Sequence, residues 1–269
     1  MNRSYLFVPG NRPERFAKAL ASGAGVVILD LEDAVPPEGK LAARVAVCQW
    51  LREHNGAAWV RVNGTDTEFF EDDVRAVAEV PSGGIILPKV EAATQLHSVA
   101  ALLGTSATPV IALIESAVGL SSALEIAQGP QVERLAFGSV DFQLDTGIQS
   151  DDEGLLFARS QLVIVSRIAR ILSPIDGVTV QIGNAVQLER DVARARAFGF
   201  GAKLCIHPNQ IAAVERGFRP SDVEVRWARS VVDAFNLAAG NAVRLDGKLI
   251  DLPVVERARH LLSEIDLKP

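Results

Sequence analysis

The sequence predicts a (β/α)₈ barrel followed by a C-terminal helical extension. Eight short runs rich in Val, Ile and Leu recur along residues 1–220, and stretches with the periodicity of helices lie between them. No Gly-, Ser- or Pro-rich linker interrupts this alternation, which favours parallel strands joined by helical crossovers. Eight repeats in this length fit a closed barrel better than an open doubly wound sheet.

The strand runs are almost continuously apolar, as expected for strands that are covered on both faces. They occupy residues 5–8, 26–31, 58–62, 84–87, 109–114, 134–137, 175–180 and 202–206, of which 175–180 is the weakest. The helical stretches occupy residues 12–21, 41–53, 94–103, 116–127, 155–172 and 186–198. In the second of these, Leu41, Val45 and Cys48 lie on one apolar stripe, which predicts its buried face.

The chain is longer than eight repeats require. Residues 1–220 suffice for the catalytic barrel, and residues 221–269 carry two further helical patterns, at 223–239 and 254–265. We expect this second segment to be a helical extension that serves as a lid or as a contact between subunits of an oligomer.

Composition excludes several classes of function. The 27 Lys and Arg residues are outnumbered by 33 Asp and Glu residues, and no basic run occurs, so nucleic-acid binding is not expected. No apolar run approaches the roughly 20 residues that span a bilayer, and the N-terminus lacks the features of a signal peptide. Cys48 and Cys205 have no CxxC or CxxH context, so neither disulfides nor zinc are indicated. We expect a cytoplasmic protein with no membrane partner.

Polar side chains follow the predicted strands, at the end where the loops of such a barrel converge. They include Arg12, Asp30, Glu32, Asp33, Arg61, Lys89, Glu115, Asp141, Asp176 and His207. Glu32, Arg61, Lys89, Glu115 and Asp141 follow one another at intervals of 26 to 29 residues, in one phase of the repeat, and should therefore share one mouth. For His207, which precedes Pro208 and Asn209, a role in a turn is at least as good an explanation as a catalytic one.

Two carboxylates in this set indicate a metal site. Glu115 directly follows an apolar strand, and capping explains it poorly because the serine after it is the better helix cap. Asp141 could cap a helix or bind a metal, and Asp145 is an alternative ligand from the same segment. Carboxylates from adjacent strands, with Glu32 and Asp33 nearby and no His or Cys among them, make a hard-oxygen site that favours Mg²⁺ over zinc.

Cationic residues at the same mouth suit an anionic substrate. Arg61 ends a strand and could bind a carboxylate or carbonyl group, while its alternative role is a structural pair with Asp33. Arg3, Arg12 and Lys89 add positive charge at the rim. No GxGxxG or GxxxxGK[ST] motif follows a strand, so the sequence does not support nucleotide-dependent redox or kinase activity. The GxSxG nucleophile elbow of α/β-hydrolases is also absent from the sequence.

Eight short motifs, in order along the chain, resemble the citrate lyase β-subunit-like branch of the HpcH/HpaI aldolase/citrate lyase family of CoA-ester lyases. They lie at residues 3–10, 30–35, 61–63, 87–89, 112–116, 138–141, 155–159 and 247–251, so the resemblance runs essentially end to end. Where the citrate lyase subunit looks like Gly-Ala-Glu-Asp, this chain has Gly138-Ser139-Val140-Asp141. It keeps the aspartate and lacks the glutamate.

This resemblance implies a Mg²⁺-dependent carbon–carbon lyase that cleaves a citryl-, malyl- or citramalyl-type CoA thioester to an acyl-CoA and a small oxo acid. Glu115 and Asp141 would be the Mg²⁺ ligands, and Arg61 and Glu115 would contact substrate. Arg12 and Lys89 would be placed to help hold the CoA portion.

The expected catalytic residues are Arg61, Asp251, Glu32 and Asp33. Arg61 would stabilise the enolate of the thioester, and Asp251 would assist proton transfer in the site of a neighbouring subunit. The resemblance therefore implies a homo-oligomer, a trimer or a hexamer. Citrate lyase subunits also work with an acyl-carrier partner; nothing in this sequence indicates one, and a stand-alone lyase is favoured.

Other activities remain open. A malate synthase-like condensation or a malyl-CoA thioesterase would use nearly the same groups. A CoA-independent class II hydroxy-oxo-acid aldolase would be expected to carry a histidine base near the early strand ends, where this chain has none. A non-catalytic binding protein is the remaining alternative.

Overall fold

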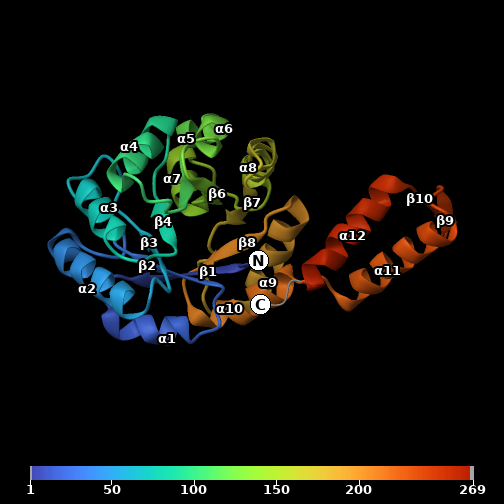
Figure 1. The fold of residues 1–269 in the computed structure, drawn as a ribbon, viewed down its shortest axis with the longest axis horizontal. Helices are drawn as coiled ribbons and strands as arrows, with labels where there is room; N and C mark the ends of the chain where they lie inside the picture. The colour runs from blue at the N-terminus through green and yellow to red at the C-terminus, as the bar shows by residue number, and fades with distance from the viewer. Residues whose placement is uncertain (1, 267–269) are drawn as a thin grey trace. The chain divides into compact units, whose positions relative to one another are not determined.

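The computed structural model describes residues 2–266, and within them eight parallel strands close into a barrel (Figure 1), which confirms the predicted fold. The strands are β1 (Ser4–Pro9), β2 (Val26–Asp30), β3 (Trp59–Arg61), β4 (Gly84–Leu87), β5 (Val110–Ile114), β6 (Val132–Phe137), β7 (Leu172–Asp176) and β8 (Ala202–Cys205). They pair in sequence order, and β1 closes the barrel by pairing with β8 as well as with β2.

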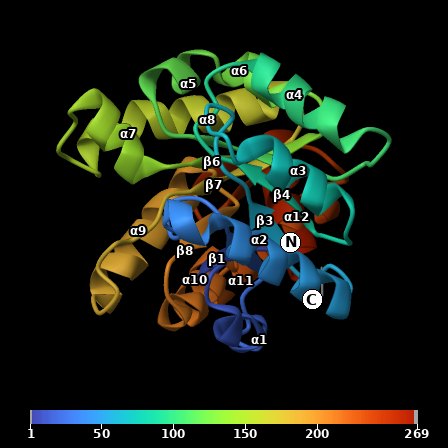
Figure 2. The same cartoon turned by 90° about the vertical axis from the view of Figure 1, so that its left-hand side faces the viewer.

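The chain forms two compact units, one from Asn2 to Glu215 and one from Arg216 onward. In the first unit the helices lie outside the ring of strands (Figure 2). They are α1 (Phe16–Leu20), α2 (Lys40–Glu53), α3 (Phe70–Ala78), α4 (Ala93–Leu103), α5 (Ala117–Ser121), α6 (Ala123–Ala127), α7 (Ser139–Thr146), α8 (Leu156–Ala169), α9 (Ala185–Phe198) and the start of α10 (Ile211–Phe218), with 3-10 turns η1 (Pro13–Arg15), η2 (Pro37–Gly39), η3 (Glu153–Leu155) and η4 (Pro208–Gln210). Among the helices of residues 2–266, none has the length and apolar character to cross a bilayer.

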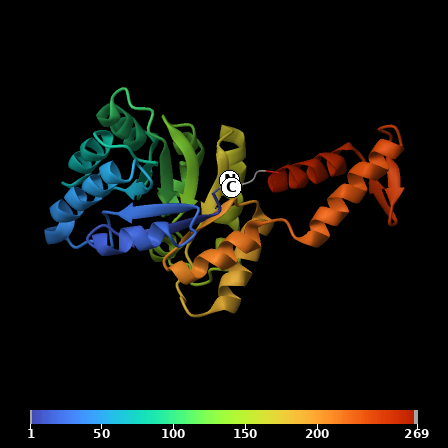
Figure 3. The ribbon, with the colours of Figure 1, turned by 60° about the horizontal axis from the view of Figure 1, so that its bottom comes forward.

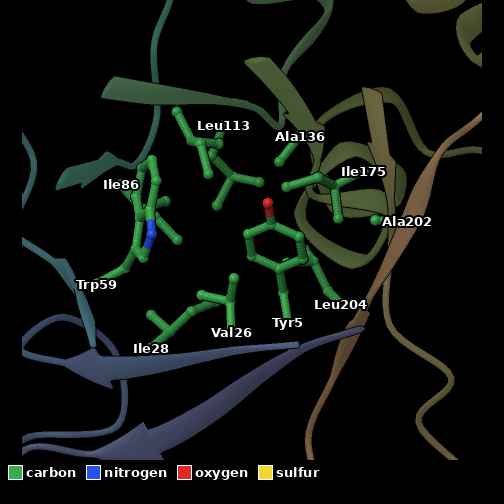
Figure 4. Close-up of a cluster of buried hydrophobic side chains, with 11 residues drawn as sticks. Tyr5, Val26, Ile28, Trp59, Ile86, Leu113, Ala136, Ile175, Ala202 and Leu204 are labelled. Carbon is green, nitrogen blue, oxygen red and sulfur yellow. The ribbon is translucent and has the colours of Figure 1, made fainter. Parts of the chain in front are cut away.

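Apolar side chains fill the interior of the barrel (Figure 4). Val26 and Ile28, two residues apart on β2, both belong to this cluster, as do Ala202 and Leu204 on β8. Val27, which lies between the first pair, is also buried because the helices cover the outer face of the strands. Burial on both faces explains why the strand runs are apolar throughout, and each such aliphatic side chain contributes roughly 1.5–3 kcal/mol to folding.

The buried face of α2 differs from the predicted stripe. Cys48 is buried, but Leu41 and Val45 are exposed by 67% and 58%. Lys40 and Arg44 turn inward instead, where they bond to carbonyl oxygens of the loop after β2 and to carboxylates of α3. Buried cations need such partners, and satisfying them rotates Leu41 and Val45 outward, so the prediction was wrong for these two residues.

Three other local features differ from expectation. The helix expected at 116–127 is two short helices, α5 and α6, separated at Ser122, where a pair of serines weakens helical propensity. Strand β7 begins earlier than expected and ends at Asp176, before Gly177. Helices α3 and α7 were not among those expected.

The second unit contains the two helices expected after residue 220. Helices α11 (Asp222–Leu237) and α12 (Leu252–Asp266) lie side by side (Figure 3) and share a small apolar core. Between them is a hairpin, β9 (Val243–Leu245) and β10 (Lys248–Ile250), that was not expected. Its turn residues, Asp246 and Gly247, have φ of 48° and 77°, which suits the Asp-Gly signal for a two-residue hairpin loop.

Candidate active site

Arg61 is held at the end of β3 by two buried carboxylates. The parallel register pairs it with Asp30, the last residue of β2. Its Nε and Nη2 donate to the two carboxylate oxygens of Asp30, each at 2.7 Å, and its Nη1 lies 2.9 Å from Oε2 of Glu32. Burial disfavours the guanidinium charge, but these carboxylates outweigh it and keep the pKa of Arg61 above its ordinary value. The structural partners of Arg61 are therefore Asp30 and Glu32, not Asp33.

Lys89 connects two of the acidic residues. It follows β4, and its Nζ lies 2.7 Å from Oε1 of Glu32 and 3.6 Å from Oδ1 of Asp33. Its backbone N–H donates to Oε1 of Glu115 at 2.7 Å. Lys89 has a φ of 51°, a left-handed conformation that costs free energy for a residue with a side chain and persists where surrounding contacts hold it.

Glu115 is a buried acid with two other carboxylates near it. It directly follows β5 and is only 4% exposed. Burial raises the pKa of Glu115 to about 8; the carboxylates of Glu32 and Asp141 add to the rise, and the N–H of Lys89 opposes it. Gly138 makes room for this side chain, because a Cβ at Gly138 would lie 2.6 Å from Oε2 of Glu115.

Asp141 is available to a ligand, whereas Asp145 already has a structural contact. Asp141 lies in the first turn of α7 and is half-buried, and within residues 2–266 its carboxylate has no hydrogen bond or ion pair. Asp145 accepts the N–H of Ala117 at 2.7 Å, at the start of α5. This contact gives Asp145 a capping role and favours Asp141 as the ligand from this segment.

Two pockets meet at Glu115 and Asp141. The inner pocket has a volume of about 70 Å³, and both carboxylates line it together with Arg61, Ser139 and apolar side chains from the strand ends. The outer pocket has a volume of about 480 Å³ and is lined by the same two carboxylates, Lys89 and other polar residues of the neighbouring loops. A ligand bound at the two carboxylates thus has a small compartment on one side and a large one on the other.

Three of the predicted site residues in the barrel line neither pocket. Glu32 is buried and anchors Arg61. Asp33 is exposed beside Lys89, and Arg12 is exposed in the turn after β1. The remaining predicted residues of the barrel line one or both pockets: Arg61, Lys89, Glu115 and Asp141.

Asp251 and His207 both make capping contacts. Asp251 stands between β10 and α12 in the second unit, and its Oδ1 accepts a long bond, 3.4 Å, from the N–H of Val254. Its role in a neighbouring subunit stays a prediction. The Nδ1 of His207 accepts the N–H of Asn209 at 3.1 Å, which gives His207 the turn role that its sequence context indicated.

A buried ionic cluster joins the end of β7 to the start of α8, and the sequence predicted neither its pairs nor the burial of Arg159. Arg159 is 1% exposed, and it donates to Oδ1 of Asp176 at 3.0 Å and to Oδ1 of Asp151 at 2.9 Å. Arg194 of α9 donates to the other oxygen of Asp151 at 2.6 Å. These bonds fix the segment that follows α7. The available signal was Arg159 itself, which belongs to the motif at 155–159.

The donor set at the two pockets fits a hard divalent cation. Within the described residues, no group of three or more His, Cys, Asp or Glu is arranged to hold a metal ion, so the protein offers the pair Glu115 and Asp141. Mg²⁺ is commonly bound by one or two carboxylates, with water and substrate completing its octahedron. A cation between them would also relieve the repulsion that contributes to the raised pKa of Glu115.

Comparisons with known proteins identify the same family over most of the chain. The family model described as HpcH/HpaI aldolase/citrate lyase matches residues 3–208. A citrate lyase subunit beta-like protein of Deinococcus radiodurans is 35% identical, with 97% of this chain and 96% of that protein covered. A (3S)-malyl-CoA thioesterase of Cereibacter sphaeroides is 32% identical, with 98% and 94% covered. The solved structure of the CitE protein of Mycobacterium tuberculosis, in complex with magnesium, acetoacetate and coenzyme A, has a TM-score of 0.87, 33% identity and 98% coverage of both chains.

Proposed function

From the premise that this chain belongs to the HpcH/HpaI aldolase/citrate lyase family, we propose that it is a Mg²⁺-dependent lyase of a β-hydroxyacyl-CoA thioester. The products would be an acyl-CoA and a 2-oxo acid. The observation that carries this proposal is the meeting of a small and a large pocket at Glu115 and Asp141. Such an arrangement suits a substrate with a compact acid at one end and a long carrier at the other.

Glu115 and Asp141 would hold the metal. When bound, Mg²⁺ would lower the pKa of the substrate hydroxyl group and balance the negative charge that develops on its oxygen. The CitE relative binds magnesium together with acetoacetate and coenzyme A, which supports assigning the same kind of ligands to this chain. The lining of both pockets supports it independently, because Glu115 and Asp141 border each of them and the charge of Asp141 contributes to the raised pKa of Glu115.

Arg61 would donate hydrogen bonds to the thioester carbonyl oxygen. Among the contacts of the described residues, Asp30 and Glu32 take three of its N–H groups, and a guanidinium has five, so two remain for the inner pocket. Because the carboxylates fix the guanidinium before substrate arrives, these donors need little reorganisation as charge develops on the oxygen.

In the proposed cleavage, a base removes the hydroxyl proton and the carbon–carbon bond breaks. The electron pair of that bond moves to the α-carbon of the thioester, which becomes an enolate and then takes up a proton to give the acyl-CoA. The carbinol carbon becomes the carbonyl carbon of the oxo acid. We assign proton transfer to Asp251 of the partner subunit in a homotrimer or homohexamer. In support, Glu115 and Asp141 are the only carboxylates among the described residues that line the inner pocket.

The test is product analysis with purified protein, Mg²⁺ and malyl-, citramalyl- and citryl-CoA. A lyase releases an oxo acid and acetyl-CoA in equal amounts, and chelation of Mg²⁺ should stop the reaction. Absence of oxo acid from every ester would overturn the proposal.

A thioesterase is the second candidate function, favoured by the identity with a (3S)-malyl-CoA thioesterase over 98% of this chain. It would release free CoA and leave the hydroxy acid intact. A thiol reagent detects free CoA in the same incubations, so the ratio of free CoA to acetyl-CoA separates the two activities.

A further inference from the structure

Arg159 lies directly behind the wall of the inner pocket. It belongs to α8, is 1% exposed and lines neither pocket. Its guanidinium carbon lies 5.6 Å from the centroid of the Phe137 ring, and Phe137 lines the inner pocket. The same ring packs edge-on against Phe142 of α7, the residue after Asp141, with 5.3 Å between ring centroids. Arg159 thus contacts the wall of the site from outside.

The guanidinium group of Arg159 joins two loops. Its Nε donates to Oδ1 of Asp176, the last residue of β7, at 3.0 Å. Its Nη1 and Nη2 donate to the carbonyl oxygen and to Oδ1 of Asp151, at 2.5 Å and 2.9 Å. Asp151 follows α7, the helix that carries Asp141. Because a guanidinium is planar and rigid, these bonds fix the separation of the loop after α7 and the loop after β7.

The chain after Asp176 packs tightly against the start of α7. A Cβ at Gly177 would lie 2.2 Å from Oγ of Ser139, the first residue of α7, so only glycine allows so close an approach here. Val178, the next residue, lines the inner pocket together with Ser139. Nζ of Lys203 donates to the carbonyl oxygen of Gly177 at 2.5 Å. A shift of Asp176 would therefore move the pocket wall and the start of α7.

Stability alone explains this ionic cluster poorly. Asp176 is fully buried, and among the described residues its Oδ2 has no hydrogen bond and lies 3.9 Å from the nearest cation, Nζ of Lys203. Buried ion pairs contribute little net stability, because the cost of desolvating both charges offsets much of their attraction. Aliphatic side chains would stabilise the same volume as well, whereas a bidentate cation imposes a direction and a distance. The arrangement therefore suits a role in fixing geometry.

We infer that Arg159 is a positioning residue for the metal site. It holds the loops after α7 and β7 so that the wall of the inner pocket keeps its shape and Asp141 stays where it can share one cation with Glu115. It touches neither substrate nor metal and acts through Asp151 and Asp176. The inference rests on the proposed function for the reaction that Arg159 affects, while its effect on metal binding can be measured without any substrate.

The first test replaces the guanidinium by a single ammonium group. Arg159→Lys keeps the charge and can bond to one of the two aspartates, but it cannot span both. We expect Mg²⁺ binding, measured by calorimetry, to weaken about 10-fold. At saturating Mg²⁺, kcat for the best CoA ester should fall about 100-fold with little change in KM, because a displacement of about 1 Å can have that effect on the chemical step. Wild-type Mg²⁺ affinity in the folded variant would overturn the inference. If the wild type binds Mg²⁺ but cleaves no ester, the proposed function fails while the comparison of Mg²⁺ affinities still decides this inference.

Two control variants separate positioning from loss of stability. Val165→Ala truncates a buried side chain further along α8 that lines neither pocket. It should lower the melting temperature because it leaves a cavity, yet bind Mg²⁺ as the wild type does. Arg190→Met removes an exposed guanidinium that pairs with Asp152 at 3.1 Å, and it should leave both properties unchanged. If Val165→Ala weakens Mg²⁺ binding as much as Arg159→Lys does, the effect belongs to stability and the inference fails.

A double variant keeps the test decisive if a single substitution at Arg159 prevents folding. Arg159→Met leaves the buried charge of Asp176 without its close partner, and Asp176→Asn removes that charge, so the double variant should melt higher than Arg159→Met alone. Its Mg²⁺ affinity should stay about 10-fold below that of the wild type, because the group that joined the two loops is gone. Recovery of wild-type affinity along with stability would overturn the inference.

Discussion

The backbone N–H of Lys89 donates a 2.7 Å hydrogen bond to Glu115 from a residue whose φ is 51°. The side-chain Nζ of the same residue forms an ion pair with Oε1 of Glu32 at 2.7 Å. One strained position thus orients a candidate metal ligand through its backbone and an anchor of Arg61 through its side chain.

Replacing Lys89 by glycine or by alanine should separate these two effects. Both variants lose the ion pair with Glu32, but glycine adopts a positive φ freely and alanine does not. We expect Lys89→Ala to be less stable than Lys89→Gly by about 1 kcal/mol in urea unfolding. Equal stabilities would show that the left-handed conformation is not maintained in solution.

The raised pKa of Glu115 predicts that stability depends on pH when Mg²⁺ is absent. The folded protein binds this proton more tightly than the unfolded chain, so the contribution is fully present below about pH 4.5 and is lost as pH rises through about 8. Melting temperatures measured in chelator should therefore fall more steeply over this range for the wild type than for Glu115→Gln.

Added Mg²⁺ should reverse this loss, because the ion competes with the proton for Glu115. The increase in melting temperature on adding Mg²⁺ should be larger near pH 8.5 than near pH 5.5. A shift of the same size at both values, or one that persists in Glu115→Gln, is incompatible with metal binding at this carboxylate.

Asp141 and Asp145 form a matched pair for locating the metal ligand on α7. Asp141→Asn should weaken Mg²⁺ binding by at least about 10-fold in calorimetry and change stability by less than about 0.5 kcal/mol, since its carboxylate has no partner in the described structure. Asp145→Asn keeps an oxygen to accept the N–H of Ala117 and should bind Mg²⁺ normally. The reverse order of affinities would transfer the ligand role to Asp145.

The proposed action of Asp251 across subunits predicts complementation. Asp141→Asn and Asp251→Asn should each lose nearly all lyase activity as pure proteins. When the two are unfolded together and reassembled, about a quarter of the sites in a random mixture combine an intact Asp141 with an intact Asp251 from the partner subunit, and activity should return accordingly. If both residues serve the same chain's site, the mixture stays inactive.

The barrel could be predicted from the sequence because a strand buried on both faces is apolar at nearly every position. This pattern can be recognised without knowing which residues are in contact. Eight apolar runs separated by helical periodicity are enough to specify that architecture. Arg61, Lys89, Glu115 and Asp141 could be predicted to lie at one mouth for a related reason, because position at a strand end is readable from the pattern. Each of the four lines at least one of the two pockets, and their roles there stay a prediction.

The partners of those residues could not be predicted, because they depend on register and side-chain direction. Asp30 rather than Asp33 anchors Arg61 since the β2–β3 register places the last residues of the two strands side by side. The choice between Asp141 and Asp145 turned on a hydrogen bond across helices to Ala117. Helical periodicity predicted Leu41 on the buried face of α2, but Leu41 is exposed. The buried face instead carries Lys40 and Arg44, whose charged groups have hydrogen-bond partners inside the protein.

The bonds of Asp151 have a consequence for how the protein can be altered. Arg159 and Arg194 both donate hydrogen bonds to Asp151, which follows the short stretch 147–150. Asp145, which precedes the stretch, bonds α7 to α5. The chain is therefore held in place on both sides of residues 147–150. Gln149 and Ser150 within that stretch are exposed. A peptide tag or fluorescent reporter inserted between them would leave these contacts on either side intact. We therefore expect this loop to accept a probe without moving Asp141.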